Sequence, residues 1–229
     1  MSHTNVYRNS VVADNYEAML EKRKGLCSFD TQYLEENIKK NDKILDLGCG
    51  TGRHVLKFCD MAKITGIDIS EKMIKIAREK IKDKAKLIVG NILETKNLVN
   101  SKFNIVLMMY HTLGSIDSLE DRKKIFSQVY NLLKENGRLI LHVHNRNHIN
   151  NLKFLLKRTQ GDRKITSGVL DGAVIHFFTK NEIKELAEKY NFKIEEIIYL
   201  KYPDEEKQIT GWKRLFYTGG FIFKLKNIS

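Results

Sequence analysis

The chain has 229 residues, 42% of them hydrophobic, and a formal net charge of +12 at pH 7. This length allows one complete α/β core, and the lack of a long uncharged apolar run excludes a membrane-spanning segment. Neither a signal peptide nor a paired cysteine pattern is visible, so we expect one soluble domain with reduced thiols in the cytoplasm. The positive charge leaves nucleic acid open as a partner, although the chain is rich in Lys, Ile and Asn throughout.

Two helices are expected first, over residues 11–22 and 29–38, because apolar residues recur there at helical spacing. Tyrosines are interspersed with them, at Tyr7, Tyr16 and Tyr33. Such a side chain either packs with its hydroxyl at the surface or faces a ligand, and both interpretations stay open.

A glycine-rich turn then follows a buried strand expected at residues 43–47. Its glycines permit positive φ and let a ligand touch bare backbone. The helix expected at 53–59 presents free N–H groups to that ligand. The next strand, 64–67, ends in Asp68, which is placed to accept both hydroxyls of a ribose. The pattern therefore indicates a pocket for an adenosine-bearing cofactor.

The turn resembles the first motif of the class I S-adenosylmethionine-dependent methyltransferases, E/D-x-G-x-G-x-G, in the segment Asp46-Leu47-Gly48-Cys49-Gly50-Thr51-Gly52. Dinucleotide dehydrogenases carry a different glycine spacing, with the third glycine further into the helix. The resemblance implies S-adenosylmethionine as the cofactor. It also implies a Rossmann-like α/β fold whose seven-stranded sheet has the order 3-2-1-4-5-7-6, with the last strand antiparallel, and N-terminal lid helices.

The resemblance extends over nearly the whole chain, which we interpret as a single domain, 1–229. The remaining expected elements are a helix at 71–80, a third strand and adenine-binding turn at 87–92, a strand at 103–109, a helix at 119–133, a glycine turn and fifth strand up to 141, a helix capped by Thr179, and a strand pair at 192–200 and 215–224. The expected parts are lid helices at 1–40, a cofactor-binding core at 41–144, a substrate-cap insertion at 145–178, and a C-terminal helix and strand pair at 179–229.

Cofactor contacts follow from the resemblance, residue by residue. A lid residue, Tyr16 or Arg8, is expected to reach the carboxylate of the cofactor. Asn91 stands where the family most often has Asp, and its side-chain oxygen can still accept from the adenine amine, without a carboxylate's charge. The expected cofactor-binding residues are Tyr16, Asp46, Gly48, Cys49, Gly50, Gly52, Arg53, Asp68, Ile69, Asn91, Ile92 and Met108.

The residues at the end of the fourth strand limit which methyl-transfer reactions are expected. They are Met109-Tyr110-His111-Thr112. It lacks the Asp/Asn-Pro-Pro-aromatic segment that the family uses on base amino groups, and no cysteine nearby supplies a nucleophile for cytosine C5. A metal-assisted transfer is not expected either, because no acidic cluster surrounds this strand. Direct displacement onto N or O of a small metabolite remains, resembling the Methyltransf_25/11 type.

Three side chains are expected to carry this chemistry. His111 is the candidate base or acceptor-orienting group, since imidazole titrates near working pH, although it could instead line the cofactor wall. Tyr110 and His144 are expected beside it. His142 and His144 share one strand face, but with no carboxylate or cysteine to complete a set we expect no metal site.

A basic stretch over 145–164 is expected to cover the substrate entrance, with a helix at 149–158. It favours a small, anionic acceptor, with Tyr7, Arg146, Lys153 and Lys157 as candidate contacts. A solvated helix face is the plainer interpretation. Two alternatives for the whole chain stay open: a methyltransferase acting on the wobble-uridine side chain of tRNA, and a cofactor-binding partner subunit without catalysis. The oligomeric state is not indicated.

Overall fold

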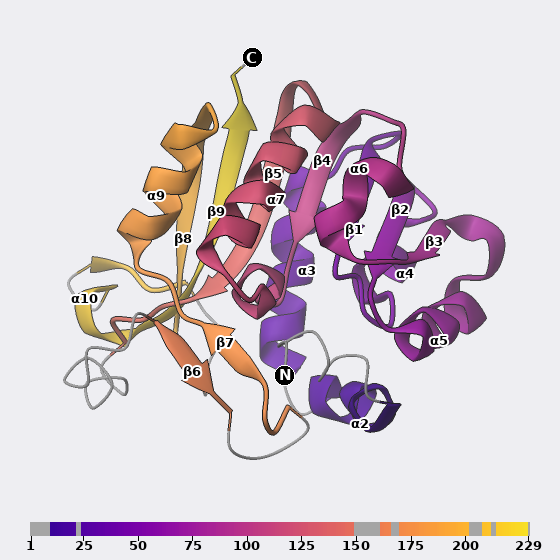
Figure 1. The fold of residues 1–229 in the computed structure, drawn as a ribbon, viewed down its shortest axis with the longest axis horizontal. Coiled ribbons are helices and arrows are strands. Elements are labelled where there is room, and N and C mark those ends of the chain that lie inside the picture. The colour runs from indigo at the N-terminus through magenta and orange to yellow at the C-terminus, as the bar shows by residue number, and fades with distance from the viewer. Residues whose placement is uncertain are drawn as a thin grey trace.

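A seven-stranded sheet in the order β3-β2-β1-β4-β5-β9-β8 forms the centre of the computed structural model (Figure 1). The structure describes residues 10–21, 24–148, 161–165, 170–201, 208–211 and 214–228. The predicted sheet order is confirmed, with β9 as the antiparallel seventh strand between β5 and β8. The strands are β1 (Lys43–Leu47), β2 (Lys63–Asp68), β3 (Lys86–Val89), β4 (Phe103–Met108), β5 (Leu133–His144), β8 (Phe192–Lys201) and β9 (Thr218–Asn227).

Helices cover both faces of the sheet, which is why its central strands are continuous apolar runs. One core cluster joins the sheet to α7 and α9 through side chains such as Phe126 and Ile183. The other joins it to α3, α4 and α5 through Leu34, Phe58 and Ile74. The helices are α2 (Ser10–Glu21), α3 (Lys24–Asn37), α4 (Arg53–Phe58), α5 (Glu71–Ile81), α6 (Thr95–Leu98), α7 (Leu119–Leu132), α9 (Lys180–Lys189) and α10 (Arg214–Tyr217), with short 3-10 turns η1 (Lys82–Lys84), η2 (Ile92–Glu94) and η3 (Thr112–Ser115).

The element boundaries follow local capping. Thr179 caps α9 as predicted, and its hydroxyl accepts from the backbone of Glu182, whose side chain accepts from Thr179 in return. The last strand starts at Thr218 rather than at residue 215, because Arg214–Tyr217 forms the helical turn α10. The third strand ends at Val89, so that only Gly90 and Asn91 precede η2.

A separate two-stranded hairpin occupies the connection between β5 and α9. Its strands are β6 (Asp162–Lys164) and β7 (Val174–His176), and the helix expected at 149–158 lies outside the described residues. The segment after β7 pairs with the end of β5: the Phe178 amide donates to His144 O at 2.9 Å, and the Arg146 amide donates to Phe178 O at 2.9 Å. Figure 1 shows the hairpin beyond the end of β5, below the sheet, at the same end of the molecule as α2.

Among the described helices, none combines the length and apolar character that a membrane crossing requires.

Candidate functional site

The glycine turn lies between two close neighbours that leave no room for side chains. Gly52 has φ 80°, and a Cβ placed on it would lie 2.6 Å from Ile81 Cδ1 on α5. Gly48 has φ 74°, and its Cβ would lie 2.7 Å from the side chain of Thr112. The turn therefore presents bare backbone, and the segment that follows β4 is packed directly against it.

Two carboxyl groups line this turn, those of the buried Asp46 and the partly buried Asp68. Asp68 accepts from the Gly50 amide through Oδ2 and from the Ser70 amide through Oδ1, each at 2.9 Å, and burial raises its pKa against these hydrogen bonds. Burial likewise raises the pKa of Asp46 to about 7, which the charge of Asp68 reinforces and that of Arg53 opposes. Asp46 Oδ2 has no hydrogen-bond partner within the described part of the chain. A ligand that donates to this oxygen would satisfy it.

Tyr16 brings α2 onto the turn. Its Cε1 lies 3.5 Å from the position that a Cβ of Gly50 would take. α2 also contacts α5 and α3, so this N-terminal helix lies beside the glycine turn. Tyr7 and Arg8, the other predicted contacts in this region, lie outside the described residues.

Several predicted cofactor residues contribute backbone or packing rather than a side chain pointing at the turn. The Cys49 thiol packs near Gly66, and burial raises its pKa well above the ordinary value. Met108 is fully buried in the core. Asn91 Oδ1 accepts from the Leu93 amide at 3.0 Å and so caps η2, while Ile69 and Ile92 are only partly buried beside Asp68 and Asn91.

A stack of planar side chains starts at the end of β4. Tyr110 and His111 both have positive φ, 53° and 69°, a conformation that costs energy in residues other than glycine and often marks a functional site. The ring of His111 stacks on His144 with centroids 3.2 Å apart, and His144 stacks on Phe177 with centroids 4.6 Å apart. The three predicted catalytic residues, Tyr110, His111 and His144, are therefore brought together beside the glycine turn.

Asp30, Arg53 and His142 form a cluster of polar side chains next to this stack. The sequence did not lead us to expect this cluster. Arg53 Nη2 lies 3.2 Å from Asp30 Oδ2, and His142 Nδ1 lies 3.5 Å from Asp30 Oδ1. Burial acts to raise the pKa of Asp30, but His142 and Arg53 outweigh it and hold the pKa below its ordinary value. His54 stays neutral, because burial and the charge of Arg53 lower its pKa to about 3.

The signal for Asp30 was present in the sequence. It lies four and eight residues before Leu34 and Ile38, on the buried face of α3, where an acidic residue is unusual. Arg53, which is predicted to contact the cofactor, pairs with Asp30, and its guanidinium lies 5.8 Å from the centre of the Tyr110 ring.

A network of ion pairs holds the hairpin on the domain. His176 on β7 contacts Asp162 Oδ1 through Nδ1 at 2.6 Å and Glu182 Oε1 through Nε2 at 3.3 Å. Arg122 on α7 lies 3.5 Å from Asp162, and Arg146 lies 3.6 Å from Glu182. The hairpin is thereby tied to α7 and α9, and the segment after β5 is tied to α9.

Because of Glu182, the free energy of unfolding is expected to depend on pH in the acid range. Burial acts to raise its pKa, but the hydrogen bonds from His176 and Thr179 lower it from 4.5 to about 2. Its stabilising contribution is therefore present above pH 4.5 and is lost as the pH falls through about 2. Urea unfolding across this range should show a shallower pH slope for Glu182→Gln than for wild type. Glu185→Gln, an exposed position on the same helix, is the control, and equal slopes for all three proteins would contradict the prediction.

Gly114→Ala is expected to separate the hairpin from η3. A Cβ at Gly114 would lie 2.6 Å from the backbone oxygen of His176, which no side-chain rotation can relieve. We expect a loss of stability of roughly 1–3 kcal/mol, measured by urea unfolding, and faster amide exchange in β7. Gly172→Ala, where the added Cβ meets open space but φ is 84°, serves as the control for strain alone. Unchanged exchange in β7 would show that the contact is not needed.

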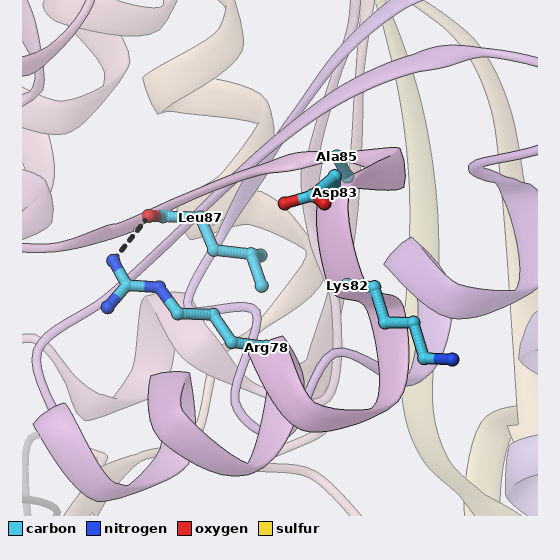
Figure 2. Close-up of a pocket in the computed structure, with 5 residues that line it drawn as sticks. All are labelled: Arg78, Lys82, Asp83, Ala85 and Leu87. Carbon is cyan, nitrogen blue, oxygen red and sulfur yellow. Dashed lines mark hydrogen bonds between the residues drawn. The ribbon is translucent and has the colours of Figure 1, made fainter.

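Two other kinds of ligand site are a metal site and a surface hollow. Among the described residues, no group of three or more His, Cys, Asp or Glu side chains is arranged to hold a metal ion. Figure 2 shows a hollow where β3 begins, in which Arg78 donates to Leu87 O at 2.9 Å. No residue of the glycine turn reaches this hollow, which is lined by Arg78, Lys82, Asp83, Ala85 and Leu87.

The sheet order, the glycine turn after β1 and the acid ending β2 define the class I fold of S-adenosylmethionine-dependent methyltransferases. The pattern of the Methyltransf_31 family, described as a methyltransferase domain, matches residues 38–208. The chain therefore belongs to this family of methyltransferase domains.

The individual relatives have low sequence identity to this chain. YqeM of Bacillus subtilis, provisionally named a methyltransferase, is 27% identical over 116 residues, which are 50% of this chain and 47% of YqeM. The chain thus spans about half the length of that relative. UbiE of Francisella philomiragia, a ubiquinone/menaquinone biosynthesis C-methyltransferase, is 26% identical over 200 residues, covering 80% of this chain and 68% of UbiE.

Solved structures share the fold. The magnesium protoporphyrin IX methyltransferase of Synechocystis PCC 6803, determined with bound S-adenosylhomocysteine, superposes with a TM-score of 0.66. It is 16% identical in sequence, and the match covers 98% of this chain and 99% of that one.

Proposed function

We propose that this protein transfers a methyl group from S-adenosylmethionine to a nitrogen or oxygen of a small, anionic metabolite by direct displacement. The observation that carries the proposal is the contact of Thr112 with Gly48, because it fixes the neighbouring His111 beside the glycine turn. In direct displacement the cofactor supplies the methyl group and its leaving group, and the enzyme mainly orients the acceptor.

The residues around the turn fit the cofactor. Gly48 and Gly50 would let the cofactor approach bare backbone, and Asp68, at the end of β2, would accept from the ribose hydroxyls. The buried Oδ2 of Asp46, which lacks a hydrogen-bond partner among the described residues, would accept a hydrogen bond from the cofactor. A cationic ammonium there would favour the ionised form of this carboxyl. Tyr16 borders the same space from α2.

On the acceptor side, His111 would take the proton from the attacking nitrogen or oxygen, with Tyr110 and His144 positioning the acceptor. Residues 145–178 would form a cap over the acceptor, since β7 contacts η3 directly after His111. Arg146 lies at the start of this cap. The other three predicted acceptor contacts, Tyr7, Lys153 and Lys157, fall outside the described residues.

Isothermal titration with S-adenosylhomocysteine tests the cofactor assignment directly. Incubation with methyl-labelled S-adenosylmethionine and a panel of amines and alcohols bearing a carboxylate or phosphate then tests the transfer. Mass spectrometry of the product identifies the methylated atom. Transfer to carbon, as the name of UbiE describes for that protein, would contradict the N or O assignment.

The net charge of +12 supports tRNA as the alternative acceptor. Absorbance at 260 nm in the purified protein, together with labelling of total tRNA, would favour it over a small metabolite. Binding of S-adenosylhomocysteine without transfer to any acceptor would favour a catalytically silent partner subunit.

A further inference from the structure

Asp30 places a carboxylate in the interior of the domain. It lies on α3, four residues before Leu34, and both side chains are fully buried. Burying a carboxylate costs free energy unless its charge is compensated. Two side chains compensate it here, because Arg53 Nη2 lies 3.2 Å from Oδ2 and His142 Nδ1 lies 3.5 Å from Oδ1. The two oxygens of one carboxylate thus contact two different side chains.

Both of these side chains reach the segment that follows β4. The ring of His142 contacts the ring of His111, with centroids 4.4 Å apart and planes inclined at 58°. The guanidinium carbon of Arg53 lies 5.8 Å from the centre of the Tyr110 ring. Because Tyr110 and His111 are consecutive, the two contacts that begin at Asp30 converge on one short segment.

The backbone of that segment depends on its surroundings. Tyr110 and His111 have φ of 53° and 69°, and non-glycine residues keep such a conformation only where neighbouring contacts hold them. The His111 amide also donates to His142 O at 3.2 Å. His142 therefore contacts His111 through both its backbone and its side chain, so the place of the His111 ring depends on that of His142.

Attachment of α3 to the sheet does not account for the charge at Asp30. Apolar side chains of the same helix, Tyr33, Leu34 and Ile38, already belong to the core cluster on this face. A buried ion pair stabilises a fold little compared with well-packed apolar side chains of similar volume. The carboxylate calls for a role in which its two oxygens orient particular groups.

We infer that Asp30 is a positioning residue: by holding His142 and Arg53, it orients His111 and Tyr110 toward the methyl acceptor. The inference rests on the proposed function, in which His111 takes the proton of the acceptor. A small displacement of a group that must meet a reacting atom lowers the rate strongly, because the geometry of attack is lost. Asp30 is assigned no contact with the acceptor and acts through its two neighbours.

A double-mutant cycle between Asp30→Asn and His111→Gln tests the inference. Asparagine keeps the shape of aspartate and removes its charge. We expect Asp30→Asn alone to lower kcat at least about tenfold, with the KM of the acceptor and the affinity for S-adenosylhomocysteine changed only a few-fold. In the His111→Gln background the same substitution should lower kcat about threefold or less, because the main residue through which it acts is gone.

Leu34→Ala is the control for a loosened helix. It removes buried packing from the same face of α3 and leaves every charge in place. We expect a lower melting temperature and a kcat within a few-fold of wild type. A fall in kcat as large as that of Asp30→Asn would show that any loosening of α3 slows the reaction, and would overturn the positioning role.

The ring signals of isotope-labelled histidines give a second readout that needs no acceptor. They are recorded by NMR on protein loaded with S-adenosylhomocysteine, and each is assigned from the variant that lacks that histidine. Asp30→Asn should shift the signals of His111. It should leave those of His176, whose ring contacts Asp162 and Glu182 on the hairpin side, unchanged.

Loss of a buried ion-pair partner can prevent folding, and His142→Gln then carries the test. It breaks the link between Asp30 and His111 and should lower kcat at least about tenfold while shifting the His111 signals. A wild-type rate and unshifted signals in His142→Gln would overturn the inference.

The outcomes separate this inference from the proposed function. Unshifted His111 signals in Asp30→Asn overturn the positioning role, while methyl transfer by wild type leaves the function standing. Affinity for S-adenosylhomocysteine that falls as far as kcat also overturns it, because Asp30 would then support the glycine turn through Arg53. Shifted signals in a protein that methylates no acceptor contradict the proposed function and support the link from Asp30 to His111.

Discussion

Replacing His111 with alanine is expected to lower the rate of methyl transfer by about a hundredfold or more, while affinity for S-adenosylhomocysteine changes only a few-fold. In the proposed function the imidazole, which is stacked on His144 and adjoins Thr112, would take the proton of the acceptor and would not hold the cofactor. Steady-state rates with an identified acceptor, paired with calorimetry, measure the two effects separately.

His111→Gln is the matched variant for this position. Glutamine keeps a hydrogen-bonding side chain but cannot take up a proton near neutral pH. A base role predicts that both variants are slow and that the pH dependence of the rate disappears in each. Turnover within a few-fold of wild type in His111→Ala would assign the histidine to the wall of the pocket, with proximity alone driving the reaction.

Asp68→Ala is expected to weaken binding of S-adenosylhomocysteine by about 2 kcal/mol, roughly 30-fold, through loss of charged hydrogen bonds to the ribose. The same carboxylate also accepts from the amides of Gly50 and Ser70, so part of the effect will come from a looser glycine turn. Calorimetry measures the affinity, and a melting curve reports on the turn.

Asp83→Ala is the control for this loss of charge. Asp83 lines the hollow of Figure 2, at the start of β3 and away from the carboxyl ends of the strands. We expect it to bind S-adenosylhomocysteine as wild type does. Equal affinities for wild type and Asp68→Ala would remove Asp68 from the cofactor site.

Much of the cofactor side could be predicted because its determinants are local in sequence. The glycines between β1 and α4 are required by positive φ at Gly48 and Gly52, and Asp68 comes directly at the end of an apolar strand. Apolar runs and caps such as Thr179 placed the strands and helices in order. The family resemblance supplied the topology, which no local pattern specifies.

Side-chain partners could not be predicted, because they depend on segments far apart in the chain. The pairing of the Arg53 guanidinium with Asp30, on a preceding helix, could not be read from the position of Arg53 after the turn. The predicted contact of Asn91 with adenine likewise gave no hint that its side-chain oxygen caps η2. Phe177 gave no periodic signal, since it lies beside a hairpin of three-residue strands.

The pairing of Phe178 with the end of β5 affects how well the chain tolerates changes of length. The residues that bracket the excursion, His144 to Arg146 on one side and Phe178 on the other, are hydrogen-bonded to each other. A loop whose ends are already joined can change length cheaply, at about 0.6 kcal/mol for each doubling. We therefore expect changes of length within residues 149–160, which lie between the joined ends in sequence and outside β6 and β7, to leave the glycine turn and His111 in place.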